Sequence, residues 1–374
     1  MNRNGQRAER NSRKRRLFAL ASVLILGAAA FLFWFPNRSE LPPTENESRS
    51  STTDGLVAAD RATFIAVGDI MLSRGVARVI ARAGSPDRPF SLVKDELLNT
   101  DFNFGNFESP VSGNDSVLGE GLVFNTRKRD FIGVVNARFK VVNLANNHIL
   151  DQGLNGMRNT EKIIRSNAIE YLGVGEDEAE AWEPKYFTAN RIRIAFIGAS
   201  FSSVNDLGVT RNKYVARIED VDRLAASITN AKAKSDIVVV TMHAGVEYTR
   251  EPNKAQVNFA RAAVDAGADI VIGAHPHWIQ TVEEYHGRWI FYSLGNFIFD
   301  QSKPDTKEGL MLRIQLIKPG KRGSGGAVIE RIDLLPIVID SIGVPRLATP
   351  DEKQRILGKI GLSNSSIVIG AEAK

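Results

Sequence analysis

Two histidines separated by one proline are the most specific chemical feature of this sequence. His275 and His277 stand in the segment Gly-Ala-His-Pro-His, directly after an apolar run rich in β-branched residues. Alternate residues of an extended segment project to the same side, so the two imidazoles can be presented together. Neutral imidazole is a common metal ligand. The pair therefore predicts a metal site.

Polar side chains of matching chemistry follow other apolar runs, and four of the five histidines fall in such segments. A single polar residue after a strand commonly caps a helix or satisfies a backbone group, but agreement among five strands weakens this explanation. Imidazole nitrogens with carboxylate and amide oxygens suit Mn, Fe or Zn better than Ca or Mg. The identity of the ion, and whether one or two are held, stay open. The residues concerned are Asp69, Asn106, Glu108, Asn147, His148, His243, Glu247 and Asn296.

Short β-branched runs alternate with helical stretches from residue 61 onward, which is typical of an α/β domain. Ligand sites of open α/β sheets lie beyond the carboxyl ends of the strands, so residues distant in the sequence can meet there. A helix is predicted where Val257, Ala260 and Val264 recur on one face, with Gly267 placed to end it. Strands are predicted at residues 63–67, 102–104, 141–144, 194–197, 237–241, 270–272 and 289–292.

The first 35 residues predict one membrane-spanning helix. Residues 17–35 carry no charge, and 19 residues at about 1.5 Å each span roughly the hydrocarbon core. Residues 1–16 hold seven Arg or Lys residues against one Glu, a charge of +6, so this basic tail is expected in the cytoplasm and the domain on the outer side. A signal peptide cleaved near Ala28 is the alternative. The apolar run continues past that point, which favours a single-pass anchor in the cell membrane.

Charge and composition exclude several other classes. The net charge is +5, and removing the +6 of the basic tail leaves 5 − 6 = −1, so no broad nucleic-acid-binding surface is expected. The absence of cysteine excludes disulfides, thiolate ligands and a cysteine nucleophile. Residues 36–60 have the composition of a flexible linker. We expect the domain at 61–345, with a late hairpin between 310–317 and 327–335, and a C-terminal tail at 346–374 with a short helix at 351–360.

Six short motifs resemble one known family. Their types and their order along the chain, over roughly residues 61–340, resemble those of the bacterial poly-γ-glutamate capsule-synthesis proteins of the CapA type. That family is a branch of the calcineurin-like metallophosphatase superfamily. The resemblance implies an α/β (α+β) domain, a four-layer α-β-β-α metallophosphatase-like sandwich with two mixed sheets packed face to face. The motifs are Gly-Asp-Ile-Met at 68–71, Asn-Phe-Glu at 106–108, Ala-Asn-Asn-His at 145–148, His-Ala-Gly-Val-Glu-Tyr at 243–248, Gly-Ala-His-Pro-His at 273–277 and Tyr-Ser-Leu-Gly-Asn-Phe at 292–297.

The resemblance also implies roles for individual residues. Glu108 matches a bridging acid, and His148 matches a histidine just outside the ligand set. Met71 stands where the superfamily has a histidine, and thioether sulfur is a poor ligand for a hard divalent ion, so a full two-metal site is in question. The proposed ligands are Asp69, Glu108, Asn147, His243, His275 and His277.

Two functions follow from the sequence. The first is a membrane-anchored, metal-dependent phosphoesterase-like hydrolase or transferase in the synthesis, export or attachment of poly-γ-glutamate or a similar anionic polymer. In it His148 is a general acid or oxyanion donor, Glu247 is either an acid near the metal or a surface carboxylate, and Asn106 and Asn296 line the pocket. The alternative is a non-catalytic scaffold with a structural metal, which works beside membrane-bound synthase or export subunits.

Overall fold

The computed structural model describes residues 59–115, 121–202, 212–320, 326–362 and 366–368. The predicted basic tail and membrane helix, and nearly all of the predicted linker, lie outside these residues. No helix among the described residues is long and apolar enough to cross a membrane.

A mixed sheet of nine strands contains both the first and the last described strand. Its order is β14-β13-β12-β1-β2-β3-β4, while β11 also pairs with β1 and β15 with β13. Neighbours from β1 to β4 are parallel, whereas β12, β13, β14 and β15 pair antiparallel. The strands are β1 (Asp60–Ile70), β2 (Phe102–Phe107), β3 (Phe139–Asn143), β4 (Glu170–Leu172), β11 (Asn296–Ile298), β12 (Glu308–Lys318), β13 (Val328–Ser341), β14 (Val344–Leu347) and β15 (Ser366–Val368).

A second mixed sheet has six strands in the order β5-β6-β7-β8-β10-β9. Its four inner strands are parallel, and the two edge strands pair antiparallel with their neighbours. The strands are β5 (Lys185–Ala189), β6 (Ile192–Ser200), β7 (Ile237–His243), β8 (Ile270–Ala274), β9 (Val282–Tyr285) and β10 (Arg288–Phe291).

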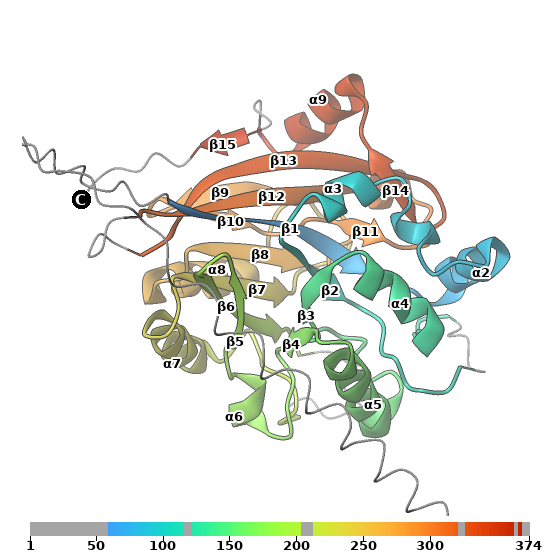
Figure 1. Ribbon diagram of the computed structural model, residues 1–374, viewed down its shortest axis with the longest axis horizontal. Helices are drawn as coiled ribbons and strands as arrows, with labels where there is room; N and C mark the ends of the chain where they lie inside the picture. Colours follow the sequence, from blue (N-terminus) through green and yellow to red (C-terminus); the bar gives the residue numbers. More distant parts are fainter. Residues whose placement is uncertain (1–58, 116–120, 203–211, 321–325, 363–365, 369–374) are drawn as a thin grey trace, which may run out of the picture. The chain divides into compact units, whose positions relative to one another are not determined.

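The two sheets pack face to face, and helices cover their outer faces (Figure 1). Between the sheets, the rings of Phe64 and Phe104 lie 6.2 and 5.3 Å from that of Phe196. Phe131 of α4 packs on the first sheet, and Phe259 of α8 packs on the second. The helices are α2 (Arg74–Ala83), α3 (Lys94–Leu98), α4 (Lys128–Asn136), α5 (Gly153–Ser166), α6 (Glu178–Ala181), α7 (Val221–Lys232), α8 (Lys254–Ala266) and α9 (Pro350–Lys359), with 3-10 turns η1 (Arg88–Phe90) and η2 (Pro304–Lys307).

The mixed α/β class with two mixed sheets is confirmed, and so are the elements predicted for it. The seven predicted strands are β1, β2, β3, β6, β7, β8 and β10, and the late hairpin is β12 and β13. The predicted helix is α8, which Asn253 caps at its start and Gly267 ends with a φ of 110°. The C-terminal helix is α9, whose Ile356 side chain is buried. The domain boundary at residue 345 stays a prediction.

Two glycines let neighbouring strands approach closely beside the polar strand ends. A Cβ atom on Gly68 would lie 1.9 Å from the carbonyl oxygen of Gly295, and one on Gly273 would lie 2.0 Å from that of Tyr292. Any side chain at these positions would push the strands apart. The glycines therefore set how closely the segments that follow β1 and β8 can converge.

Candidate metal centre

The carboxyl ends of strands from both sheets meet at one buried cluster. Asp69 lies at the end of β1 and Glu108 directly follows β2, whereas His243 ends β7 and His275 follows β8. Two groups of three side chains offer possible metal ligands within 4.8 Å of one another: Glu108, His243 and His275, and Asp69, Glu108 and His277. All of these side chains are buried. Five of the six predicted ligands thus come together, and Glu108 belongs to both groups.

Asn147, the sixth predicted ligand, lies against the same cluster. Its Oδ1 atom is 2.7 Å from Nε2 of His243, which in turn is 3.8 Å from Oε1 of Glu108. Two atoms that each lie about 2.1 Å from one ion are roughly 3.0 to 4.2 Å apart. The shorter of the two contacts is also a hydrogen bond, which His243 Nε2–H donates to Asn147. The amide oxygen is therefore close to the spacing that a shared ion requires.

Polar atoms without partners mark where a cation fits. Among the described residues, neither carboxylate oxygen of Glu108 accepts a hydrogen bond, and Nδ1 of His275 has no partner. Glu108 is 0% exposed and His275 is 4% exposed. An unpartnered buried polar group costs about 1–3 kcal/mol, more when it is charged, so such groups are rare in folded proteins. A divalent cation bound to these atoms would offset that cost, and the carboxylate, amide and imidazole donors suit Mn, Fe or Zn.

Burial also shifts the protonation of these side chains. Burial first, and then the negative charge of Asp69, raises the pKa of Glu108 well above its usual 4.5. Burial, followed by repulsion from His277, lowers the pKa of His275 to about 3. Burial likewise lowers the pKa of His243 well below 6.5. The two imidazoles are thus neutral near pH 7, and Nδ1 of His275 has no partner, whereas an anionic Glu108 requires a cation beside it.

Asparagine side chains hold the candidate ligands in place. Asn106 Nδ2 donates to Asp69 Oδ1 at 2.8 Å and to His243 Nδ1 at 3.1 Å. Asn296 Oδ1 accepts from His277 Nδ1 at 2.9 Å. Both asparagines, predicted to line a pocket, are buried and contact the candidate ligands directly. Their hydrogen bonds orient the ligand side chains, as outer-shell partners of metal ligands commonly do.

The two histidines of the His-Pro-His segment are not presented by an extended strand. The φ angle is 98° at His275 and 58° at His277, because the chain turns sharply after β8 ends at Ala274. The expected extended geometry was therefore wrong, although both rings still reach the cluster. Left-handed backbone at residues other than glycine costs about 1–3 kcal/mol and is concentrated at functional sites. This backbone strain occurs where the chain positions the imidazoles of His275 and His277 in the cluster.

His148 lies at the edge of the cluster beside a carboxylate that the sequence analysis did not select. Its Nδ1–H donates to Asp151 Oδ2 at 2.8 Å, and its Nε2 lies 3.7 Å from Glu108 Oε1. The ring stacks on Phe124 with 3.9 Å between centroids. Asp151 fixes the proton on Nδ1 and aims Nε2 at the cluster. A carboxylate three residues after His148 was the sequence signal for this pair.

Neither Glu247 nor Met71 belongs to the two groups of candidate metal ligands. Glu247 is exposed in the turn after β7, which fits a surface carboxylate near the centre. Its charge nevertheless adds to the raised pKa of Glu108, and together with burial it raises the pKa of Tyr248 to about 12. Met71 is buried, and its sulfur lies 3.0 Å from the backbone nitrogen of Ser73, from which it accepts a hydrogen bond. The position that lacks the superfamily histidine is thus engaged with the backbone.

The comparison with protein families decides the classification. Residues 63–301 match the family described as bacterial capsule synthesis protein PGA_cap, and this range contains every residue of the buried cluster. The chain belongs to the PGA_cap family. The resemblance to capsule-synthesis proteins of the CapA type is thereby confirmed.

Two relatives of this PGA_cap chain come from Bacillus species. It is 34% identical over 298 residues to "Capsule biosynthesis protein CapA" of Bacillus anthracis, covering 78% of this chain and 70% of that protein. It is 33% identical over 331 residues to "PGA biosynthesis protein CapA" of Bacillus subtilis (strain 168), covering 87% and 82%. Among solved structures, it is similar to the calcineurin-like phosphoesterase YfkN of Bacillus subtilis at 12% identity and a TM-score of 0.46, covering 81% and 97%. A structural similarity with this identity and TM-score supports no conclusion about activity.

Replacing Glu108 by Gln should have opposite effects on stability without and with metal. A raised pKa in the folded state means that the metal-free protein loses stability as pH rises from about 4.5 toward that raised value. Without metal at pH 8, Glu108→Gln should therefore be more stable than the wild type by about 1–3 kcal/mol. With Mn²⁺ the order should reverse, because the neutral amide gives up the charge that attracts the ion. Calorimetric Tm values with EDTA and with Mn²⁺ measure both effects.

Glu284→Gln is the matched control. Glu284 is exposed, and this substitution also replaces one carboxylate by an amide. It should leave both Tm values unchanged. Equal Mn²⁺-dependent shifts in the wild type and in Glu108→Gln would contradict the placement of the ion at Glu108.

Proposed function

We propose that this PGA_cap protein is a metal-dependent, phosphoesterase-like hydrolase or transferase in the synthesis, export or attachment of poly-γ-glutamate or a similar anionic capsule polymer. The observation that carries the proposal is the buried Glu108 carboxylate without hydrogen-bond partners, set between neutral histidines. One or two ions of Mn, Fe or Zn would be held by the predicted ligands. A bound ion would supply a Lewis acid that polarises a phosphoryl or acyl oxygen. The names of the Bacillus relatives support the assignment to capsule biosynthesis.

The residues around the centre have separate tasks in this proposal. His148 acts in its doubly protonated form: Asp151 holds Nδ1–H, and Nε2–H gives its proton to the leaving group, which leaves the neutral imidazole. Phe124 covers one face of that ring and keeps water away from it. Asn106 and Asn296 keep the neighbouring imidazoles in orientation.

A scaffold function has one observation in its favour. Glu108 and His243 are both 0% exposed, and Met71 is turned to the backbone of Ser73 in place of a further ligand. A fully enclosed ion with few open positions is typical of structural sites. In this second proposal the domain holds a growing polymer or the subunits of a membrane-bound synthase or export complex.

Replacing His148 by Ala distinguishes the two proposals. If the protein is catalytic, His148→Ala should lower kcat about 10²- to 10⁴-fold while the metal content stays at the wild-type level. Asp151→Asn should cause a smaller loss and shift the pH profile, because it changes the proton held on Nδ1. Turnover on phosphodiester and γ-glutamyl substrates, metal content and polymer yield in cells are the measurements.

His286→Ala serves as control, because this side chain is 69% exposed at the surface, where it pairs with Asp265 and stacks on Tyr285. It should keep full turnover. Normal polymer yield in the His148→Ala strain, together with a wild-type protein that hydrolyses neither substrate class, would contradict catalysis and support the scaffold.

We also propose that the protein is a single-pass protein of the cell membrane with its domain outside the cytoplasm. The support is the uncharged segment at 17–35 preceded by a tail of charge +6. Protease added to intact cells, after removal of the wall, should degrade the domain while a cytoplasmic marker protein stays intact. A domain that survives as well as the marker would contradict this location.

A further inference from the structure

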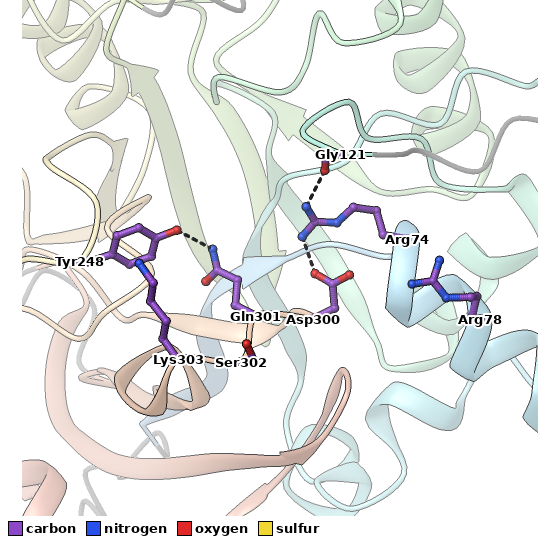
Figure 2. A pocket seen from close by; sticks show the side chains of 8 residues that line it. All are labelled: Arg74, Arg78, Gly121, Tyr248, Asp300, Gln301, Ser302 and Lys303. Atoms are coloured by element: carbon purple, nitrogen blue, oxygen red, sulfur yellow. Dashed lines mark hydrogen bonds and ion pairs between the residues drawn. The ribbon is translucent and has the colours of Figure 1, made fainter.

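A polar cavity of about 630 Å³ lies beside the candidate metal centre. Its cationic side chains come from separate elements: Arg74 and Arg78 belong to α2, whereas Lys303 directly precedes η2. In Figure 2 the two arginines lie on one side of the view and Lys303 with Tyr248 on the other. The cavity is lined by Arg74, Arg78, Gly121, Tyr248, Asp300, Gln301, Ser302 and Lys303.

Arg74 is fixed in the wall of this cavity. It forms an ion pair with Asp300 and donates from Nη1 to the carbonyl oxygen of Gly121 at 2.7 Å. Asp300 in turn accepts from the backbone N–H of Gly75 at 2.9 Å. The guanidinium also lies over the ring of Phe124, 4.6 Å from its centroid. Asp300 therefore offsets the charge of Arg74 and holds it in place.

The positive charges of Arg78 and Lys303 are available to a ligand. Among the described residues neither forms an ion pair, and both side chains are exposed toward solvent. The ammonium group of Lys303 lies 3.6 Å from the centroid of the Tyr248 ring, a cation–π contact that orients it without neutralising it. Three cations against one carboxylate leave the cavity with a charge of +2. It is therefore suited to an anionic ligand.

The cavity and the metal centre share their walls. Gln301 donates to the Tyr248 hydroxyl at 3.3 Å and accepts from Asn296, which holds His277. Phe124, beneath Arg74, is the ring on which His148 stacks. A group bound in the cavity would thus lie next to the side chains that orient the candidate ligands.

We propose that this cavity binds carboxylate groups of the substrate chain, with Arg78 and Lys303 as the specificity-determining residues. The proposal rests on the proposed function at the neighbouring centre. A phosphate dianion is best bound by donors that converge on one point. Here Arg78 and Lys303 lie on opposite sides of the view in Figure 2, which matches single charges spaced along a chain. A γ-linked glutamate chain carries one such carboxylate on every residue.

Binding of a γ-linked glutamate pentamer to the full-length protein tests this subsite. Isothermal titration calorimetry with Mn²⁺ present should show that Arg78→Gln and Lys303→Gln each weaken binding about five- to tenfold, and that the double variant loses more. The uncharged γ-linked isoglutamine pentamer, in which every α-carboxylate is an amide, should bind far more weakly, and inorganic phosphate should not displace the glutamate pentamer from the cavity. Metal content should be unchanged in every variant.

Arg82→Gln and Lys254→Gln are the matched controls. Both residues are exposed cations outside the cavity, so the double control removes the same charge. Equal loss of affinity in the double control, equal binding of the isoglutamine pentamer, or displacement by phosphate would each overturn the proposal. If the wild type binds the pentamer through Arg78 and Lys303 but holds no metal, the subsite stands and the proposed metal chemistry fails.

Discussion

The structure of this site depends on the burial of two carboxylates beside several imidazoles. Asp69 and Glu108 are both fully buried, and their mutual repulsion and burial make an anionic Glu108 costly. The neighbouring histidines do not neutralise it, because burial keeps His243 and His275 uncharged. A bound cation would make such an arrangement stable. The asparagine network and the left-handed backbone at His275 and His277 position the side chains that would bind it.

The fold builds this centre by bringing the strand ends of two sheets together. The first sheet contributes one acid at the end of β1 and one directly after β2, and the second contributes imidazoles at the end of β7 and directly after β8. Aromatic packing between the sheets, for example Phe104 on Phe196, fixes their separation. Gly68 and Gly273 allow the backbone to approach where the segments converge. Stability of the core and geometry of the centre are therefore linked, because any shift between the sheets would separate the acids from the imidazoles.

The sequence predicted which side chains come together because they stand at strand ends, and strand ends can be located from short β-branched runs. Asp69, Glu108 and His275 could be selected in this way. The sequence did not predict the left-handed backbone at His275 and His277, since that conformation arises from the turn after β8. It also missed Asp151, Arg74 and Lys303. Their roles depend on tertiary neighbours such as His148, Asp300 and Tyr248, which no local pattern identifies.

Element-specific anomalous diffraction tests the central claim most directly. Crystals of the protein grown with Mn²⁺ should show an anomalous peak within bonding distance, about 2.0–2.3 Å, of a Glu108 oxygen and of an imidazole nitrogen from His243 or His275. A second peak on the side of Asp69 and His277 would establish two ions. A well-ordered centre without any peak, in which Glu108 is paired with Asp69 through a proton, would contradict the account.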